Sequence, residues 1–188
     1  MVAELNINSL VQASKPVLRS VARSTGPDST RVSENTAGSP QILYLMLGAQ
    51  VMLTRNLWTS MGLTNGIKHG TTGQIHSIAL AAGDTPQQCT PAVVMVAFPS
   101  YKGPSTWHTN DGIPVLPIIP QTTTWEGTGG ARCTRRQIPL KLAYAITIHK
   151  CQGLTLPRAV INIGESDFSG GLTFVAVSRV KTLDSLAF

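Results

Sequence analysis

Five prolines lie within residues 99–120 of this 188-residue chain, and they exclude a long helix from that stretch. A proline inside a helix removes a backbone hydrogen bond, and its ring clashes with the turn before it. Residues 92–98 are apolar and rich in β-branched side chains, as expected of a buried strand. Residues 74–78 alternate polar and apolar side chains, as a half-buried strand does. We therefore expect a small antiparallel sheet or barrel over residues 41–138.

Turn-forming residues divide the rest of the first two thirds of the chain into short pieces. Residues 1–40 are dense in glycine, proline, serine and threonine, which predicts a loop-rich N-terminal segment. Residues 41–56 contain two short strand-like runs, and residues 135–140 are predicted to be one more extended piece. Between them lie residues that tolerate the positive φ angles of turns: Asn65, Gly66, Gly70 and Gly73.

The character of the sequence changes after Pro139. Residues 141–152 contain no proline or glycine, and Gly153 follows where a helix would end, so we expect a helix of about three turns. A strand at residues 160–163, a helix capped by Ser169 and a strand from residue 183 would follow. One face of that second helix would carry four residues: Leu172, Val175, Ala176 and Arg179. Alternating helix and strand indicates an α/β layer over residues 139–188, although about 50 residues are too few to complete such a domain.

The composition limits the class of protein. Apolar residues make up 42% of the chain and charged residues 13%, which is typical of a globular protein of one domain or two small ones. No apolar run approaches the roughly 18 residues that a membrane span needs. Lys and Arg number 15 against 9 Asp and Glu, and the net charge of +6 favours an anionic partner such as a nucleic acid or nucleotide.

The cysteines and histidines do not form a recognisable site. Cys89, Cys133 and Cys151 are odd in number and widely spaced, so the sequence indicates neither a disulfide framework nor a zinc site. The four histidines lack the i, i+4 spacing of a helical metal site. Glu4 lies where a secretion signal would be basic or apolar. These features predict an intracellular protein without a metal centre or a membrane anchor.

Residues 144–155 are the strongest sign of function. Within an apolar run they place Thr147, His149, Lys150 and Gln152, and the run ends at Gly153. A plain core segment does not need these polar groups, so we expect them to bind a ligand. The alternative is an amphipathic helix whose solvated face happens to carry His149 and Lys150.

Together with residues 174–179, Phe-Val-Ala-Val-Ser-Arg, this stretch resembles the Pif-type (petite integration frequency) ATP-dependent DNA helicases, including those of fungal genomes and Helitron elements. Residues 136–155 are similar to helicase motif V, and residues 168–179 are similar to motif VI. Residues 48–58, with Gly73 behind them, resemble the opening of the family's inserted domain 2B. The resemblance implies an α/β fold with a β insertion: part of a RecA-like second helicase domain (2A) at 139–188, and a small Src-homology-3-like β-barrel (2B) at 41–138.

The resemblance also implies roles for single residues. Arg179 would be the arginine that neutralises charge developing on the γ-phosphate of ATP, whereas the alternative is a surface cation near the end of a helix. Gln152 and Gly153 would form the turn that links the DNA contact to the nucleotide cleft. The single-stranded DNA backbone would be contacted, without sequence readout, by Thr147, His149 and Lys150.

For the whole chain, the resemblance implies the C-terminal half of an ATP-dependent 5′-to-3′ DNA helicase of the nucleus or mitochondrion, from a family that serves DNA repair, recombination and telomere maintenance. ATP and Mg²⁺ would serve the complete enzyme. The sequence has no Walker A loop and no Asp-Glu pair for a Walker B motif, so we expect the first RecA-like domain to be a missing partner. Alone, the chain is expected neither to bind ATP tightly nor to hydrolyse it. A stand-alone single-stranded nucleic-acid-binding module and an inactive helicase fragment are the alternatives.

Two further groups of residues allow two interpretations each. One is the set of tryptophans, which could stack on bases or pack in the interior: Trp58, Trp107 and Trp125. The other is a basic cluster, which could follow a phosphate backbone or form an exposed strand face: Arg132, Arg135 and Arg136.

Overall fold

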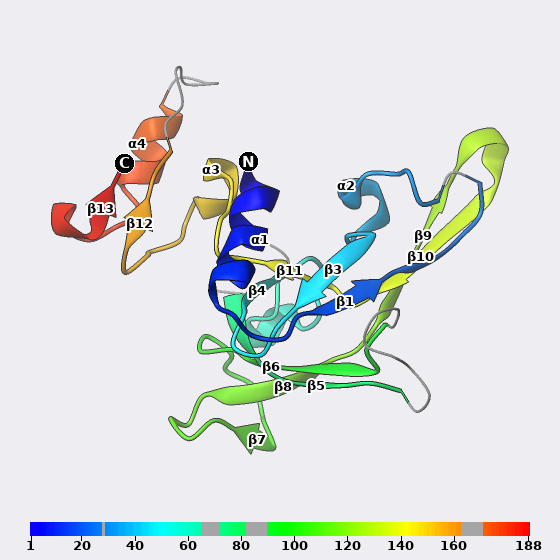
Figure 1. Ribbon diagram of the computed structural model, residues 1–188, viewed down its shortest axis with the longest axis horizontal. Helices are drawn as coiled ribbons and strands as arrows, with labels where there is room; N and C mark the ends of the chain where they lie inside the picture. Colours follow the sequence, from blue (N-terminus) through cyan, green and yellow to red (C-terminus); the bar gives the residue numbers. More distant parts are fainter. Residues whose placement is uncertain (28, 65–71, 82–89, 163–170) are drawn as a thin grey trace.

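The computed structural model describes residues 1–27, 29–64, 72–81, 90–162 and 171–188, and most of their regular structure is β-strand (Figure 1). The largest element is a six-stranded sheet in the order β11-β4-β5-β6-β8-β7, in which every neighbouring pair is antiparallel. Its strands are β4 (Gln50–Leu53), β5 (Thr72–Ala79), β6 (Val93–Ala97), β7 (Trp107–His108), β8 (Pro114–Ile118) and β11 (Leu140–Leu142). The antiparallel sheet expected in the middle of the chain is confirmed.

Strands β5 and β6 form the centre of this sheet, and both were predicted. A β-bulge interrupts their register between Ile75 and Ser77. Gly73 lies inside β5 rather than in a turn, so the turn predicted at this residue is wrong. A Cβ atom at Gly73 would lie 2.6 Å from the carbonyl oxygen of Ala97, so only glycine lets the two backbones approach this closely. The turn residues Asn65, Gly66 and Gly70 lie outside the described residues.

A second, three-stranded sheet has the order β2-β10-β9, with strands β2 (Arg23–Thr25), β9 (Gln121–Glu126) and β10 (Arg132–Gln137). β9 and β10 form a long hairpin that projects from the body of the molecule and turns through the 3-10 helix η2 (Thr128–Gly130) (Figure 1). A separate antiparallel pair joins β1 (Leu18–Val21) to β3 (Ile42–Leu45). The extended piece expected at 135–140 corresponds to the end of β10 and the start of β11.

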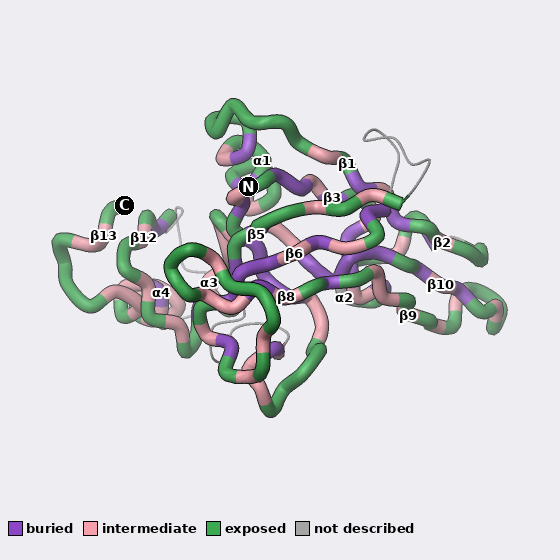
Figure 2. Tube along the Cα trace, turned by 90° about the horizontal axis from the view of Figure 1, so that it is seen from below, coloured by how far each residue is buried: buried purple, intermediate pink, exposed green. Residues whose placement is uncertain are grey.

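The hydrophobic core lies between the six-stranded sheet and the elements that cover it (Figure 2). Helix α1 (Val2–Gln12) contributes Leu10, strand β3 contributes Leu43 and Leu45, and the sheet contributes most of the rest. The 3-10 helix η1 (Thr59–Met61) packs at its margin through Met61. Among the described residues, none that follows Leu142 in the sequence belongs to this core cluster or packs against it.

The N-terminal 40 residues contain more regular structure than the loop-rich segment that we expected. They hold α1, β1, β2 and the short helix α2 (Glu34–Ala37), whose N-cap Ser33 accepts a hydrogen bond from the backbone N–H of Thr36. Strands β1 and β2 pair with β3 and β10, which come later in the chain, so their local sequence carries little sign of them. The proposed division of the chain at residue 40 stays a prediction, but both pairings cross it.

The last 50 residues also differ from expectation. Leu140–Leu142 forms strand β11 against β4, and only Ile148–Cys151 forms a helix, α3, so the helix predicted over 141–152 is wrong. The strand expected at 160–163 is β12 (Ala159–Val160), which pairs in parallel with β13 (Leu186–Ala187) after the 3-10 helix η3 (Leu183–Ser185). The second predicted helix is α4 (Leu172–Val177), with Ala176 buried, and its expected cap Ser169 lies outside the described residues. No helix in the described ranges is long and apolar enough to cross a membrane.

Candidate nucleic-acid interface

Helix α3 carries the first group of predicted site residues on a single turn. Thr147 is its N-cap in an extended conformation, and its hydroxyl makes no capping hydrogen bond. The side chains of Thr147 and His149 are exposed, so a hydroxyl and an imidazole are presented to solvent next to each other. Lys150 belongs to the same turn, but its side chain lies outside the described part of the structure. The arrangement offers hydrogen-bond donors to an anionic ligand without enclosing it.

The chain leaves α3 through a tight turn built on Gln152 and Gly153. Gln152 has φ −57° and ψ 129°, Gly153 has φ +79°, and the backbone N–H of Leu154 donates to the carbonyl oxygen of Cys151 at 3.0 Å. These values are those of a type II turn, whose third position needs the positive φ that glycine adopts freely. Both residues are exposed.

Arg179 follows α4 and lies beside the segment that leaves this turn. The backbone N–H of Leu156 donates to the carbonyl oxygen of Arg179 at 2.8 Å, and Leu156 forms a parallel β-bridge with Val180. The Arg179 side chain is half-buried, donating from Nε to the carbonyl oxygen of Val175 and from Nη2 to Oγ of Ser178, each at 2.8 Å. A guanidinium carries five donors, and the other N–H groups of Arg179 make no hydrogen bond within the described residues. The backbone therefore joins Arg179 directly to Leu156, the residue that follows the stretch 136–155, although the two are distant in sequence.

Cys151 is the buried residue of α3, and α3 packs against α4. Its thiol is buried and donates to the carbonyl oxygen of Ile148 at 2.9 Å. Burial raises the pKa of the Cys151 thiol, and the positive charge of Arg179 opposes that rise. The electrostatic effect of Arg179 on Cys151 is a second sign that α3 and α4 pack together.

Asn6 on α1 holds the segment that leads into α3, and the sequence analysis did not identify it. Its Nδ2 donates to the carbonyl oxygen of Ala145 at 2.9 Å, and its Oδ1 accepts from the backbone N–H of Ala145 at 2.9 Å. Nδ2 also donates to the carbonyl oxygen of Val2, and the residue is only 7% exposed. An asparagine inside a helix is unfavourable by propensity, and that was the only local signal of a special role.

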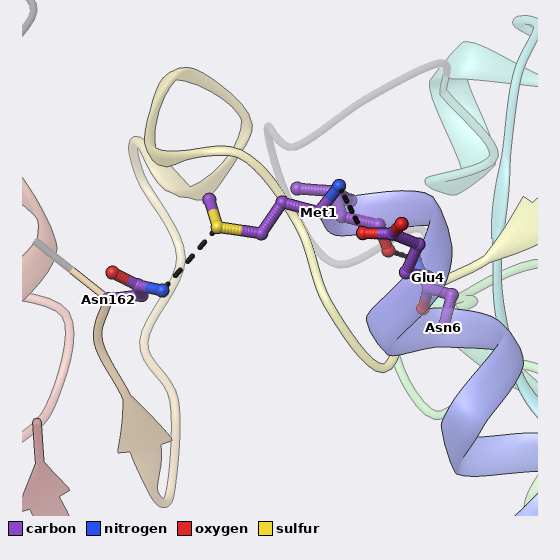
Figure 3. Close-up of polar contacts among 5 residues, drawn as sticks. Met1, Glu4, Asn6 and Asn162 are labelled. Carbon is purple, nitrogen blue, oxygen red and sulfur yellow. Dashed lines mark hydrogen bonds and ion pairs between the residues drawn. The ribbon is translucent and has the colours of Figure 1, made fainter. Parts of the chain in front are cut away.

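The start of α1 makes a further contact with the C-terminal part of the chain (Figure 3). Nδ2 of Asn162 donates to Sδ of Met1 at 3.4 Å, and the amino group of Met1 lies 2.8 Å from the carboxylate of Glu4. Together with Asn6, this contact places α1 along the connection between the sheet and α3.

The basic cluster and the tryptophans separate into different environments. Arg135 is fully buried and donates to the carbonyl oxygens of Ser29 and Ser39, whereas Arg132 and Arg136 are exposed. Neither interpretation of the cluster, a track along a phosphate backbone or an exposed strand face, holds for Arg135, which is a buried structural residue. Trp58 and Trp107 are exposed, Trp58 being tilted against Tyr101, and Trp125 lies beneath the guanidinium of Arg135.

Across the described residues, no group of three or more His, Cys, Asp or Glu could hold a metal ion.

Comparison with known proteins relates this geometry to a family. The family model for the 2B domain of the DNA helicase Pif1 matches residues 35–74. A human protein, ATP-dependent DNA helicase PIF1, is 32% identical over 188 residues, which cover 98% of this chain. The chain matches the C-terminal portion of a Pif1-type DNA helicase. Both the expected family and the portion of it are thereby confirmed.

Solved structures show that the fold of the chain is that of Pif1 helicases. A Pif1 helicase from Candida albicans superimposes with a TM-score of 0.72 and 26% identity, over 99% of this chain and 42% of that one. A Pif1 from Bacteroides, solved in complex with ADP-AlF3 and single-stranded DNA, shares the fold with a TM-score of 0.63 at 23% identity, over 99% of this chain and 37% of that one. The chain spans about a quarter of the length of the human relative, 25%.

Proposed function

We propose that this chain forms the C-terminal part of an ATP-dependent 5′-to-3′ DNA helicase, in which Thr147, His149 and Lys150 contact single-stranded DNA and Arg179 serves ATP hydrolysis. The β-rich part would correspond to a 2B domain of Src-homology-3-like type, and residues 139–188 to part of a RecA-like domain 2A. The relatives named as DNA helicases and the Bacteroides complex support this assignment. ATP and Mg²⁺ would be held largely by a first RecA-like domain that these 188 residues do not contain. The helicase would act in the nucleus or the mitochondrion.

One observation carries the proposal: the backbone N–H of Leu156, the residue after the motif V-like stretch, donates to the carbonyl oxygen of Arg179 at 2.8 Å. A helicase must couple its nucleotide state to its hold on DNA, and an element whose conformation both sites bias can provide such coupling. Here the exposed turn of α3, the type II turn at Gly153 and the strand-like segment at Leu156 form that element. A shift of Arg179 toward a γ-phosphate would pull on Leu156 through this hydrogen bond. Leu156 is connected to α3 by the turn at Gly153, so the shift would move α3 as well.

The DNA contact is tested by fluorescence anisotropy of the purified chain with a labelled single strand over a series of salt concentrations. Each phosphate contact to a single strand contributes about −0.7 to the slope of log K against log salt. We expect Lys150→Ala to make this slope about 0.7 shallower and Lys102→Ala, an exposed lysine in the loop after β6, to change it little. Binding is expected to be indifferent to ATP.

The role of Arg179 is tested in a chimera in which this chain replaces the matching segment of the human relative. An arginine that stabilises the transferring phosphoryl group is worth about 10³-fold or more in kcat. Arg179→Ala should remove that factor from DNA-stimulated ATP hydrolysis, whereas Arg158→Ala, at an exposed arginine of the same region, should not.

The same experiments separate the two alternatives. If the purified chain folds and binds single strands but the chimera does not hydrolyse ATP, the chain is a stand-alone nucleic-acid-binding module. A folded chain with no binding at low salt would be an inactive fragment.

A further inference from the structure

One face of the three-stranded sheet β2-β10-β9 is built almost entirely from arginine and threonine. Along β10, Cys133, Arg135 and Gln137 are buried on one side, so the alternate residues point to the other side. In the register of the sheet, Arg136 lies opposite Arg23 and Thr122, Thr134 lies opposite Thr25 and Thr124, and Arg132 lies opposite Glu126. Residues directly opposite on antiparallel strands share a face. We call this surface the arginine–threonine face: Arg23, Thr25, Thr122, Thr124, Glu126, Arg132, Thr134 and Arg136.

The positive charge of this face is compensated only in part within the described residues, where Glu126 lies opposite Arg132. Arg23, Arg132 and Arg136 are exposed, and in the described ranges none of them makes a hydrogen bond or an ion pair from its side chain. Arg23 and Arg136 lie directly opposite each other, and like charges at such positions destabilise a sheet. The face contains one carboxylate, that of Glu126. Folding alone gives no reason for the pair Arg23–Arg136, whereas Arg135 on the opposite side is buried and hydrogen-bonded.

The side chains of the face fit a phosphate backbone. A guanidinium stays charged and can hold two phosphate oxygens at once, and a threonine hydroxyl can donate to a third. Arg132 and Arg136 are four residues apart on one strand, which at about 3.4 Å per residue separates their Cα atoms by roughly 14 Å. That separation is close to the ~12 Å width of the major groove of B-DNA, whose two edges are lined by phosphates.

The face also has no aromatic side chain on which unpaired bases could stack. Proteins that hold unpaired bases stack them on aromatic side chains. The only aromatic residue of these three strands is Trp125, and it lies on the other side of the sheet, 5.9 Å from the guanidinium of Arg135. A duplex keeps its bases stacked inside and presents phosphates outside. We propose that the arginine–threonine face binds the phosphate backbone of double-stranded DNA, at a site separate from α3, which lies away from the β9–β10 hairpin (Figures 1 and 2).

The substitution Arg136→Glu tests this proposal, because it affects folding and binding in opposite directions. It replaces the like-charge pair with Arg23 by an opposite-charge pair, so the melting temperature should stay equal or rise. The affinity for a duplex should fall at least tenfold, because the charge at position 136 is reversed and the new carboxylate forms an ion pair with Arg23. Two lost phosphate contacts would make the salt slope of duplex binding about 1.8 shallower, at about 0.9 per phosphate.

The matched control is Lys102→Glu, which changes the net charge by the same amount on an exposed loop after β6. Binding is measured by anisotropy of the full chain with a blunt 20-base-pair duplex and with a single strand of the same length. We expect Lys102→Glu to weaken duplex binding less than twofold, and Arg136→Glu to leave single-strand binding at the level of this control. If Arg136→Glu lowers the melting temperature, Arg132→Gln and Arg23→Gln are measured in its place, and each should make the duplex salt slope shallower by about 0.9.

Three results would overturn the proposal. Equal loss of duplex binding in Arg136→Glu and Lys102→Glu would show an effect of net charge only. Equal loss of single-strand and duplex binding would assign the face to single strands. Unchanged duplex binding by a folded Arg136→Glu variant would leave the face to a partner protein with an acidic surface.

Discussion

At the scale of single residues, adjacent arginines of β10 have opposite roles. Arg135 is fully buried, donates to three carbonyl oxygens of the loop before β3 and lies over Trp125, whereas Arg136 is exposed. Burial lowers the pKa of Arg135, and nearby Glu34 opposes that change. Arg135→Leu should lower the free energy of unfolding by about 2–4 kcal/mol, because buried carbonyls lose their donors. Arg136→Gln is the control in urea unfolding, with an expected change within about 0.5 kcal/mol. Equal costs would contradict the assignment.

Asn6 acts at the same scale on the predicted DNA contact. Its side chain closes two hydrogen bonds on the backbone of Ala145, two residues before the N-cap of α3. Asn6→Ala should lower the free energy of unfolding by about 1–3 kcal/mol and speed amide hydrogen exchange over residues 143–151. Single-strand affinity should fall with it if α3 holds the strand. Asn8→Ala, exposed on the same helix, provides the control. Unchanged exchange at 143–151 would show that Asn6 does not hold this segment.

Cys151 gives a pH dependence whose sign follows from its burial. Its pKa is raised in the folded protein, so the folded state favours the neutral thiol. The stabilisation is complete below the unfolded-state pKa of about 8.5 and is lost as pH rises through the higher folded-state pKa. Between pH 7 and pH 10, the urea midpoint of the wild type should fall more steeply than that of Cys151→Ser, which carries no ionising thiol. Parallel curves would mean that the thiol is not shielded.

At the scale of elements, close packing of β5 on β6 depends on one glycine. Gly73→Ala would place a Cβ atom 2.6 Å from the carbonyl oxygen of Ala97 and 2.8 Å from the ring of Phe98. The strands would have to move apart, at an expected cost of about 1–3 kcal/mol in urea unfolding. Ser77→Ala, an exposed change on the same strand, should stay within about 0.5 kcal/mol. A neutral Gly73→Ala would mean that the sheet adjusts easily.

Elements with local signals were predictable and those that depend on distant partners were not. β5 and β6 followed from alternation and β-branched residues, and the proline-rich stretch contained no helix. The helix predicted at 141–152 failed because Lys141 and Leu142 pair with β4, which no local pattern reveals. For the candidate site, the resemblance predicted roles for Thr147, Gly153 and Arg179, which stay predictions. It could not show that Leu156 joins them, that Asn6 holds Ala145 or that Arg135 is buried, because each contact links distant segments.

At the scale of the whole molecule, the two ends of the chain differ in how they are stabilised. The core cluster and its packed neighbours end at Leu142, and the rest of the described chain adds nothing to it. Beyond it, β12 and β13 form a two-stranded parallel pair, a type of sheet that normally needs cover on both faces. Large apolar side chains there are exposed: Val160, Phe174, Leu183 and Phe188. The region is joined to the N-terminal helix through Asn6 and Met1.

This asymmetry predicts stepwise opening of the chain. Local openings require less free energy where few apolar contacts must be broken. Chymotrypsin under native conditions should therefore cut first within residues 154–188, for example after the exposed Phe174, and leave a protected fragment that contains the core. Asn6→Ala should speed this first cut, because it releases Ala145 from α1, whereas Asn8→Ala should not. Hydrogen exchange should give the same order, with amides of β5 and β6 the slowest. Loss of both parts at one rate would show that α1 couples the C-terminal region to the core as a single cooperative unit.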